Sequence, residues 1–225
     1  PDGWRLTALD DNLLTLDSCE YRLDGGEWQG PKNILHLMKE LLALQRPCDI
    51  ALRYRFVCGD LRGCERLALV MEQPAQFAVT VNGTPLSFAD EGYYKDISFR
   101  KCSIRHLVRS GENTLMLSAC FRQRQQVYDV LFGKNVYETE LNKLTYDMEL
   151  EALYLLGDFG VYSATGYTPG PNGSLHTDGP FTLGPCSAAL DAGCLTTQGL
   201  PFFAGRAVLE KTIVCGPDAA DTVLD

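Results

Sequence analysis

The stretch from Arg66 to Phe121 constrains the fold of this chain more than any other. Apolar and polar residues alternate in its short runs, and polar turn signals such as Asn82-Gly83 separate these runs. An alternation with a period of two places the apolar side chains on one face of a strand. Asn-Gly suits the tight turn of a β-hairpin, because both residues tolerate positive φ. The stretch therefore predicts several antiparallel strands that bury one face.

The rest of the chain repeats this pattern with one exception. Between Pro31 and Gln45, apolar residues recur at helical spacing, and Pro47 follows as a residue that cannot continue a helix. The turn signal Asp24-Gly25-Gly26 predicts a further hairpin. Residues 122–136 fit either a helix or a loop. Further strands are expected at Asn12–Leu23, Ile50–Val57, Tyr146–Leu156 and Arg206–Val214.

Many short strands and one good helix are typical of an all-β sandwich. We expect residues 1–160 to form the main sandwich, with a helix near residues 33–45. Residues 161–225 would either complete the sandwich with additional strands or begin a second module. The chain begins with Pro1 rather than Met, which favours a piece of a longer protein.

The charge of the chain argues against two classes of partner. Its net charge is −9, whereas nucleic acids and anionic membrane surfaces attract clustered Lys and Arg. No apolar run approaches the roughly 20 residues that span a bilayer, and no signal peptide is visible. We therefore expect no nucleic acid and no membrane partner, while a neutral ligand such as a sugar remains compatible.

The nine cysteines are scattered, and no two of them have the C-x-x-C spacing of many zinc sites. Cys120 and Cys215 lie inside apolar strand patterns, where Cys behaves as a small buried hydrophobe. These features favour free thiols in a reducing compartment or an anaerobe. Together with the lack of a visible signal peptide, they favour a cytoplasmic location. A disulfide-bonded secreted domain is the alternative.

Three segments in this order resemble a known family: Val79-Thr-Val-Asn-Gly83, Tyr94-Lys-Asp-Ile-Ser-Phe99 and the stretch Ile104–Leu115. Together they are similar to the galactose-binding-like jelly-roll domain, the sugar-binding domain of family 2 glycoside hydrolases and of α-L-rhamnosidase-like proteins. Gly199–Gly205 with Leu209-Glu-Lys211 is similar to a strand that opens a further module in such enzymes. The resemblance covers residues 50–121 strongly and the flanking residues weakly.

The resemblance implies a galactose-binding-like jelly-roll β-sandwich with a non-catalytic role. That role is to bind carbohydrate or to support the neighbouring catalytic domain of the same chain. Two alternatives remain open. The sandwich could be a structural or protein-interaction module without a ligand, or it could contribute to the rim of a glycosidase active site.

Catalytic residues are hard to assign from this sequence. A glycosidase needs two carboxylates at a set separation, and Asp158, Glu149 and Glu151 are the tempting candidates. We interpret Glu149 and Glu151 as the solvated face of a strand. The chain also has neither the length nor the pattern of the catalytic barrel of such enzymes. We expect no catalytic residues in this chain.

A sugar ring stacks its C–H face on an exposed aromatic side chain, while its hydroxyls need polar partners. We expect no cofactor and assign no metal ligands, although a structural calcium ion is compatible with the resemblance. Tyr128 and Arg100 are further possibilities for the aromatic and polar groups. The predicted ligand-binding residues are Trp28, Asn82, Tyr93, Tyr94 and Asp96.

Overall fold

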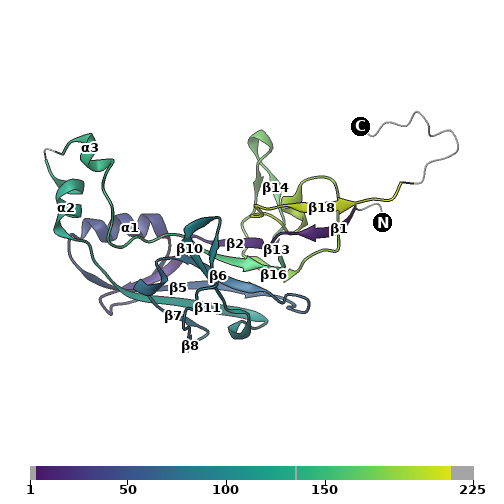
Figure 1. Cartoon of the computed structure of the whole chain (residues 1–225), viewed down its shortest axis with the longest axis horizontal. Helices are drawn as coiled ribbons and strands as arrows, with labels where there is room; N and C mark the ends of the chain where they lie inside the picture. The colour runs from purple at the N-terminus through teal and green to yellow at the C-terminus, as the bar shows by residue number, and fades with distance from the viewer. Residues whose placement is uncertain (1–3, 135, 214–225) are drawn as a thin grey trace.

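Two sheets face each other in the computed structural model, which describes residues 4–134 and 136–213 (Figure 1). One core of buried side chains from both sheets fills the space between them. The chain is therefore an all-β sandwich, as the alternating pattern predicts. Its first sheet contains β2 (Asn12–Leu16), β12 (Leu153–Gly157), β6 (Leu67–Glu72), β10 (Asp96–Ser103) and β9 (Tyr93–Tyr94), in that order.

The second sheet has eight strands, and two smaller sheets lie beside the sandwich. The main path of the second sheet is β13 (Phe159–Ser163), β16 (Phe181–Pro185), β5 (Cys48–Cys58), β11 (Gly111–Phe121), β7 (Ala78–Val81) and β8 (Thr84–Pro85), with β3 (Ser18–Leu23) on β5 and β4 (Gln29–Asn33) on β3. A three-stranded sheet holds β17 (Ala189–Leu190), β1 (Trp4–Leu9) and β18 (Ala207–Glu210), and a hairpin holds β14 (Thr168–Pro169) and β15 (Leu175–His176).

Strand β5 shows how the sequence pattern produces the core. Leu52, Tyr54 and Phe56 are buried between the sheets. Arg53 and Arg55 point to the other face, where both guanidinium groups contact the carboxylate of Glu20 on β3. The alternation expected for residues 50–57 is thus confirmed.

The predicted helix is present as α1 (Ile34–Ala43). Asn33 caps its start, because the side-chain oxygen of Asn33 accepts a hydrogen bond from the Leu35 N–H. Leu37 and Leu41 of the buried face are completely covered. The helix is shorter than the apolar pattern suggested, since residues 29–33 pair with β3 as strand β4.

The structure settles the open assignment of residues 122–136 in favour of a helix. Helix α2 (Gln125–Phe132) buries Val127 and Tyr128, and α3 (Glu138–Leu141) follows it. Together they form an arm at one end of the sandwich. The arm rises on the same side as the β14–β15 hairpin at the other end (Figure 1).

Two expected strands are wrong in their extent. The first, Asn12–Leu23, divides at Asp17 into β2 and β3, which belong to different sheets. In the second, Tyr146–Leu156, only the residues from Leu153 onward are a strand. Before Leu153, the backbone groups of Asp147 and Met148 bond to glutamine side chains instead of a neighbouring strand.

Residues 161–213 lie in three places. Strand β16 joins the sandwich, β14 and β15 form the hairpin, and β17 and β18 pair with β1 near the start of the chain. The strand expected at Arg206–Val214 is present as Ala207–Glu210. Val214 and the rest of the predicted second module, residues 215–225, lie outside the described residues.

The eight cysteines of the described segments carry free thiols. Burial raises the pKa of Cys19 to about 11, so its thiol stays protonated at neutral pH. The expectation that Cys120 is buried is wrong, because the side chains of β11 that face the core are those of Leu115, Leu117 and Phe121, and Cys120 lies on the opposite face. Cys215 lies outside the described residues.

A helix that crosses a bilayer needs about 20 predominantly apolar residues. In residues 4–134 and 136–213, no helix has the length and the apolar character that crossing a bilayer needs.

Candidate functional site

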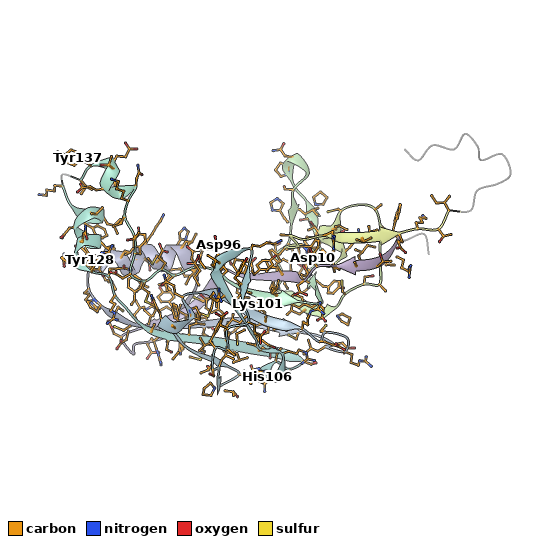
Figure 2. The ribbon with its side chains drawn as sticks, in the orientation of Figure 1. Asp10, Asp96, Lys101, His106, Tyr128 and Tyr137 are labelled. Carbon is orange, nitrogen blue, oxygen red and sulfur yellow. The ribbon has the colours of Figure 1, made fainter. Side chains whose placement is uncertain are left out.

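A surface hollow of about 550 Å³ lies where the three-stranded sheet meets the sandwich. Its size is in the range of known small-ligand sites. The wall combines the link between β1 and β2, the start of β6, the β9–β10 edge and the segment before β18. Figure 2 labels Asp10 and Lys101 of this wall. Its charged and aromatic residues are Asp10, Asp11, Arg66, Tyr93, Tyr94, Lys95 and Lys101.

Tyr93 gives the hollow an exposed aromatic surface. It lies on the short edge strand β9, and 55% of its surface is exposed to solvent. In the described part of the chain, strand β9 pairs with β10 alone and forms the end of the five-stranded sheet. An exposed aromatic ring beside charged groups is the arrangement in which a sugar ring can stack and its hydroxyls can be bound.

Tyr94 is held in the wall of the hollow by its surroundings. Lys95 Nζ lies 5.5 Å from the centroid of the Tyr94 ring, within cation–π distance. Burial raises the pKa of the Tyr94 hydroxyl, and the carboxylates of Asp11 and Asp10 raise it further. Within the described residues this hydroxyl is buried and has no hydrogen-bond partner.

The aspartates of the hollow have different partners. Asp11 Oδ1 accepts a hydrogen bond from Arg66 Nη2 at 2.8 Å, and Arg66 also lies 3.6 Å from the carboxylate of Asp158. Asp10 accepts a hydrogen bond from the backbone N–H of Arg206 at 2.8 Å, which fixes the segment before β18 against the β1–β2 link. Asp11, Arg66 and Asp158 thus form an ordered charged group at one side of the hollow.

Asp158 has a structural role. Its carboxylate accepts hydrogen bonds from the backbone N–H groups of Glu65 and Arg66. It therefore anchors the start of β6 next to the crossing from β12 to β13.

Of the five predicted ligand-binding residues, the structure brings Tyr93 and Tyr94 together in this hollow. Asn82 lies in the β7–β8 turn of the other sheet, with positive φ, as predicted for the Asn-Gly hairpin. Its side chain donates hydrogen bonds to Leu107 O and Asn113 Oδ1 and accepts one from the Thr114 N–H. These contacts hold its polar atoms within the protein.

Trp28 is also remote from the hollow in the sheet order. It lies in the loop between β3 and β4 of the eight-stranded sheet. The guanidinium carbons of Arg22 and Arg53 lie 5.2 Å and 4.1 Å from its ring centroid, so cation–π contacts cover part of the ring. A ligand role for Trp28 stays a prediction.

Asp96 lies near Tyr94 in the β9–β10 hairpin but does not line the hollow. Its carboxylate accepts hydrogen bonds from the backbone N–H and the hydroxyl of Ser98, and these bonds lower the pKa of Asp96. Arg100 pairs with Asp90. Tyr128 is buried on α2, so it presents no exposed aromatic face.

The hollow also contains residues that the sequence did not suggest, namely Asp10, Asp11, Arg66, Lys95 and Lys101. Lys95 directly follows the tyrosine pair and could have been included on that ground. The other four come from distant segments that meet only after the sheets have formed.

Glu149 and Glu151 do not form the solvated face of a strand, because no strand exists at residues 146–152. Both are half-buried and approach Glu72 at the end of β6. Burial raises the pKa of Glu72, and the carboxylates of Glu151, Glu149 and Asp96 raise it further. Burial and Glu151 likewise raise the pKa of Glu149.

The raised pKa of Glu72 predicts a pH dependence of stability. The folded pKa of Glu72 lies above its unfolded value near 4.5, so the folded state binds this proton more tightly than the unfolded state. The stability that Glu72 contributes is therefore full at low pH and is lost as the pH rises through the folded pKa. Glu72→Gln removes the ionised form and should raise the free energy of unfolding at pH 7 relative to the wild type. The gain should shrink as the pH falls toward 4.

Urea unfolding of both proteins between pH 4 and pH 8 measures this difference. Glu27→Gln is the matched control, since Glu27 is an exposed glutamate in the β3–β4 loop. An equal, pH-independent effect of both substitutions would contradict the prediction.

No metal centre emerges from the described segments. In residues 4–134 and 136–213, no three His, Cys, Asp or Glu side chains are grouped so that they could hold a metal ion. The structural calcium ion that the resemblance allows stays a prediction.

Comparisons with known sequences find no match for this chain, and the comparison with solved structures finds a weak similarity. No family model matches the sequence, and no curated protein matches it. Among solved structures, it is similar to a β-D-mannosidase from Dictyoglomus thermophilum, with 13% sequence identity and a TM-score of 0.40. The match covers 68% of this chain and 24% of the mannosidase, so the chain spans about a quarter of that enzyme. This TM-score is too low for the comparison to support a function.

Proposed function

We propose that this chain is a non-catalytic β-sandwich module that binds a carbohydrate in the hollow beside β9 and needs no cofactor. Its neighbour would be a catalytic domain of the same polypeptide, as the sequence resemblance implies. The observation that carries the proposal is the exposed ring of Tyr93 in a hollow lined with charged side chains.

The chemistry of a sugar suits this arrangement. A pyranose offers a C–H face for an aromatic ring and hydroxyls that donate and accept hydrogen bonds. Tyr93 supplies the ring, while Asp10 and Lys101 supply an acceptor and a donor. The Asp11–Arg66 pair fixes one side of the hollow, so little order has to be created when a ligand binds.

Tyr93→Ala is expected to weaken saccharide binding by about three- to tenfold, because aromatic stacking contributes about 0.5–1.5 kcal/mol. Isothermal titration of the whole chain with a panel of neutral and charged saccharides measures the change. The substitution should leave the unfolding midpoint nearly unchanged, because Tyr93 is exposed on an edge strand.

Tyr137→Ala is the matched control. Tyr137 is 76% exposed and lies on the helical arm, away from the hollow (Figure 2). It should leave affinity unchanged. Equal losses in both variants would reject the site, and no binding of any saccharide by the wild type at millimolar concentration would reject carbohydrate binding.

A second candidate, a module that holds domains together, is favoured by the same arm. Phe132, Tyr137 and Leu141 on it are exposed apolar or aromatic side chains, and such groups often mark contacts with other proteins. This function predicts that the chain binds the remainder of its polypeptide without any saccharide. Binding that requires the arm but tolerates Tyr93→Ala would support it.

A further inference from the structure

The hollow differs in charge from the rest of the molecule. The chain as a whole carries a net charge of −9. The hollow, in contrast, is lined by three cationic side chains, Arg66, Lys95 and Lys101, and by two aspartates. The two aspartates and three cations leave one excess positive charge at this place.

The hydrogen bonds show where that positive charge is available. Arg66 is neutralised, because its guanidinium group pairs with Asp11 and lies close to Asp158. Asp10 bonds to a backbone N–H. Within residues 4–134 and 136–213, neither Lys95 nor Lys101 has a carboxylate partner. The hollow is thus lined by two lysines that have no carboxylate partner among the described residues, and by Asp10.

We propose that the ligand of the hollow is an anionic saccharide, whose negative group pairs with Lys101 while its ring lies on Tyr93. This inference rests on the proposed function and specifies its ligand class. A carboxylate, as in a uronic acid, and a sulfate ester share the required chemistry, since each offers oxygen acceptors for an ammonium group.

Lys101 is better placed than Lys95 for this contact. It is half-buried on β10, where the ladder with Val70 of β6 fixes its backbone. Lys95 lies exposed in the turn before β10 with a φ of +61°, and its ammonium group is already directed over the Tyr94 ring. Lys101 therefore carries the charge preference, and Lys95 adds to the local field.

The test compares sugars that differ only at one carbon. The probes are methyl glucuronide, methyl glucoside and methyl glucoside 6-sulfate, with the same three compounds in the galactose series. The whole chain should bind at least one anionic probe about three- to tenfold more tightly than its neutral counterpart, as expected for one charge-assisted contact near the surface. The preference should shrink as salt is raised, because salt screens exposed charges.

Lys101→Gln should abolish the preference and weaken binding of the anionic probe more than binding of its neutral counterpart, because glutamine keeps a hydrogen-bond donor but removes the positive charge. Lys101→Arg should retain it, and so should Lys39→Gln, which removes an exposed lysine of α1. If the chain prefers only the glucuronide or only the 6-sulfate over the neutral sugar, the result identifies the anionic group of the ligand as a carboxylate or as a sulfate ester. Either result supports the inference.

Two other outcomes separate the claims. Equal binding of neutral and anionic sugars, or a preference that survives Lys101→Gln, would overturn the anionic ligand and leave carbohydrate binding intact. No binding of any probe at millimolar concentration would overturn both.

Discussion

Asn113→Ala is expected to lower the free energy of unfolding by about 3–4 kcal/mol, because it removes four hydrogen bonds from a completely buried side chain. Asn113 Oδ1 accepts from the backbone N–H of Arg109 and from the side chain of Asn82. Its Nδ2 donates to the backbone oxygens of Arg109 and Gly111. Alanine would remove these partners from the backbone groups of Arg109 and Gly111 and from the Asn82 side chain. Urea unfolding measures the loss.

The comparison variant is Asn142→Ala. Asn142 is exposed at the end of α3, and within residues 4–134 and 136–213 its backbone N–H is the one group of Asn142 that forms a hydrogen bond. It should change stability by less than about 0.5 kcal/mol. If Asn113→Ala came within 1 kcal/mol of the wild type, the buried hydrogen bonds would not be what holds the start of β11.

The same pair of asparagines shows what the sequence could predict. The sequence predicts a turn at Asn82-Gly83, because tolerance of positive φ is a local property. The structure confirms this turn, with Asn82 at a φ of +51° and Gly83 at +80°. It also shows that the two asparagines bond to each other across 31 positions of the sequence. That contact depends on the sheet pairing and has no local signature.

The failures of the strand predictions have a related cause. Residues 146–152 alternate as a strand does, and Met148 and Leu150 are indeed buried. A strand also requires a neighbouring backbone, however, and here the side chains of Gln76 and Gln123 take that place. Periodicity reports which side chains are buried, but it does not report the hydrogen-bond partner.

Part of the candidate site can be predicted from the sequence. Tyr93 and Tyr94 are two of the five predicted ligand-binding residues, and both line the hollow. Asp10 and Lys101 are separated by 91 positions and give no local signal. Both line the same hollow because the two sheets meet there. Asp10 directly follows β1 of the three-stranded sheet, and Lys101 lies on β10 of the five-stranded sheet.

Gly157→Ala is expected to cost about 3 kcal/mol or more in the free energy of unfolding, because the sandwich leaves no room for a side chain there. Gly157 ends β12 and pairs with Leu67 on one side and Asn12 on the other. A Cβ at this position would overlap the backbone oxygen of Arg66 and approach the Phe159 ring to 3.1 Å. A backbone atom can yield only if the strand it belongs to moves.

Gly193→Ala separates this steric effect from the entropy lost when any glycine is replaced. A Cβ on the exposed Gly193 meets no atom within 4 Å, and its φ is not in the left-handed region. Gly193→Ala should be neutral or should stabilise the protein by up to about 1 kcal/mol, because alanine lowers the conformational entropy of the unfolded chain.

Gly157→Ala should also weaken saccharide binding. Relief of its clash must displace Arg66, which lines the hollow and pairs with Asp11. A Gly157→Ala protein as stable as the Gly193→Ala protein would show that β6 can shift at little cost.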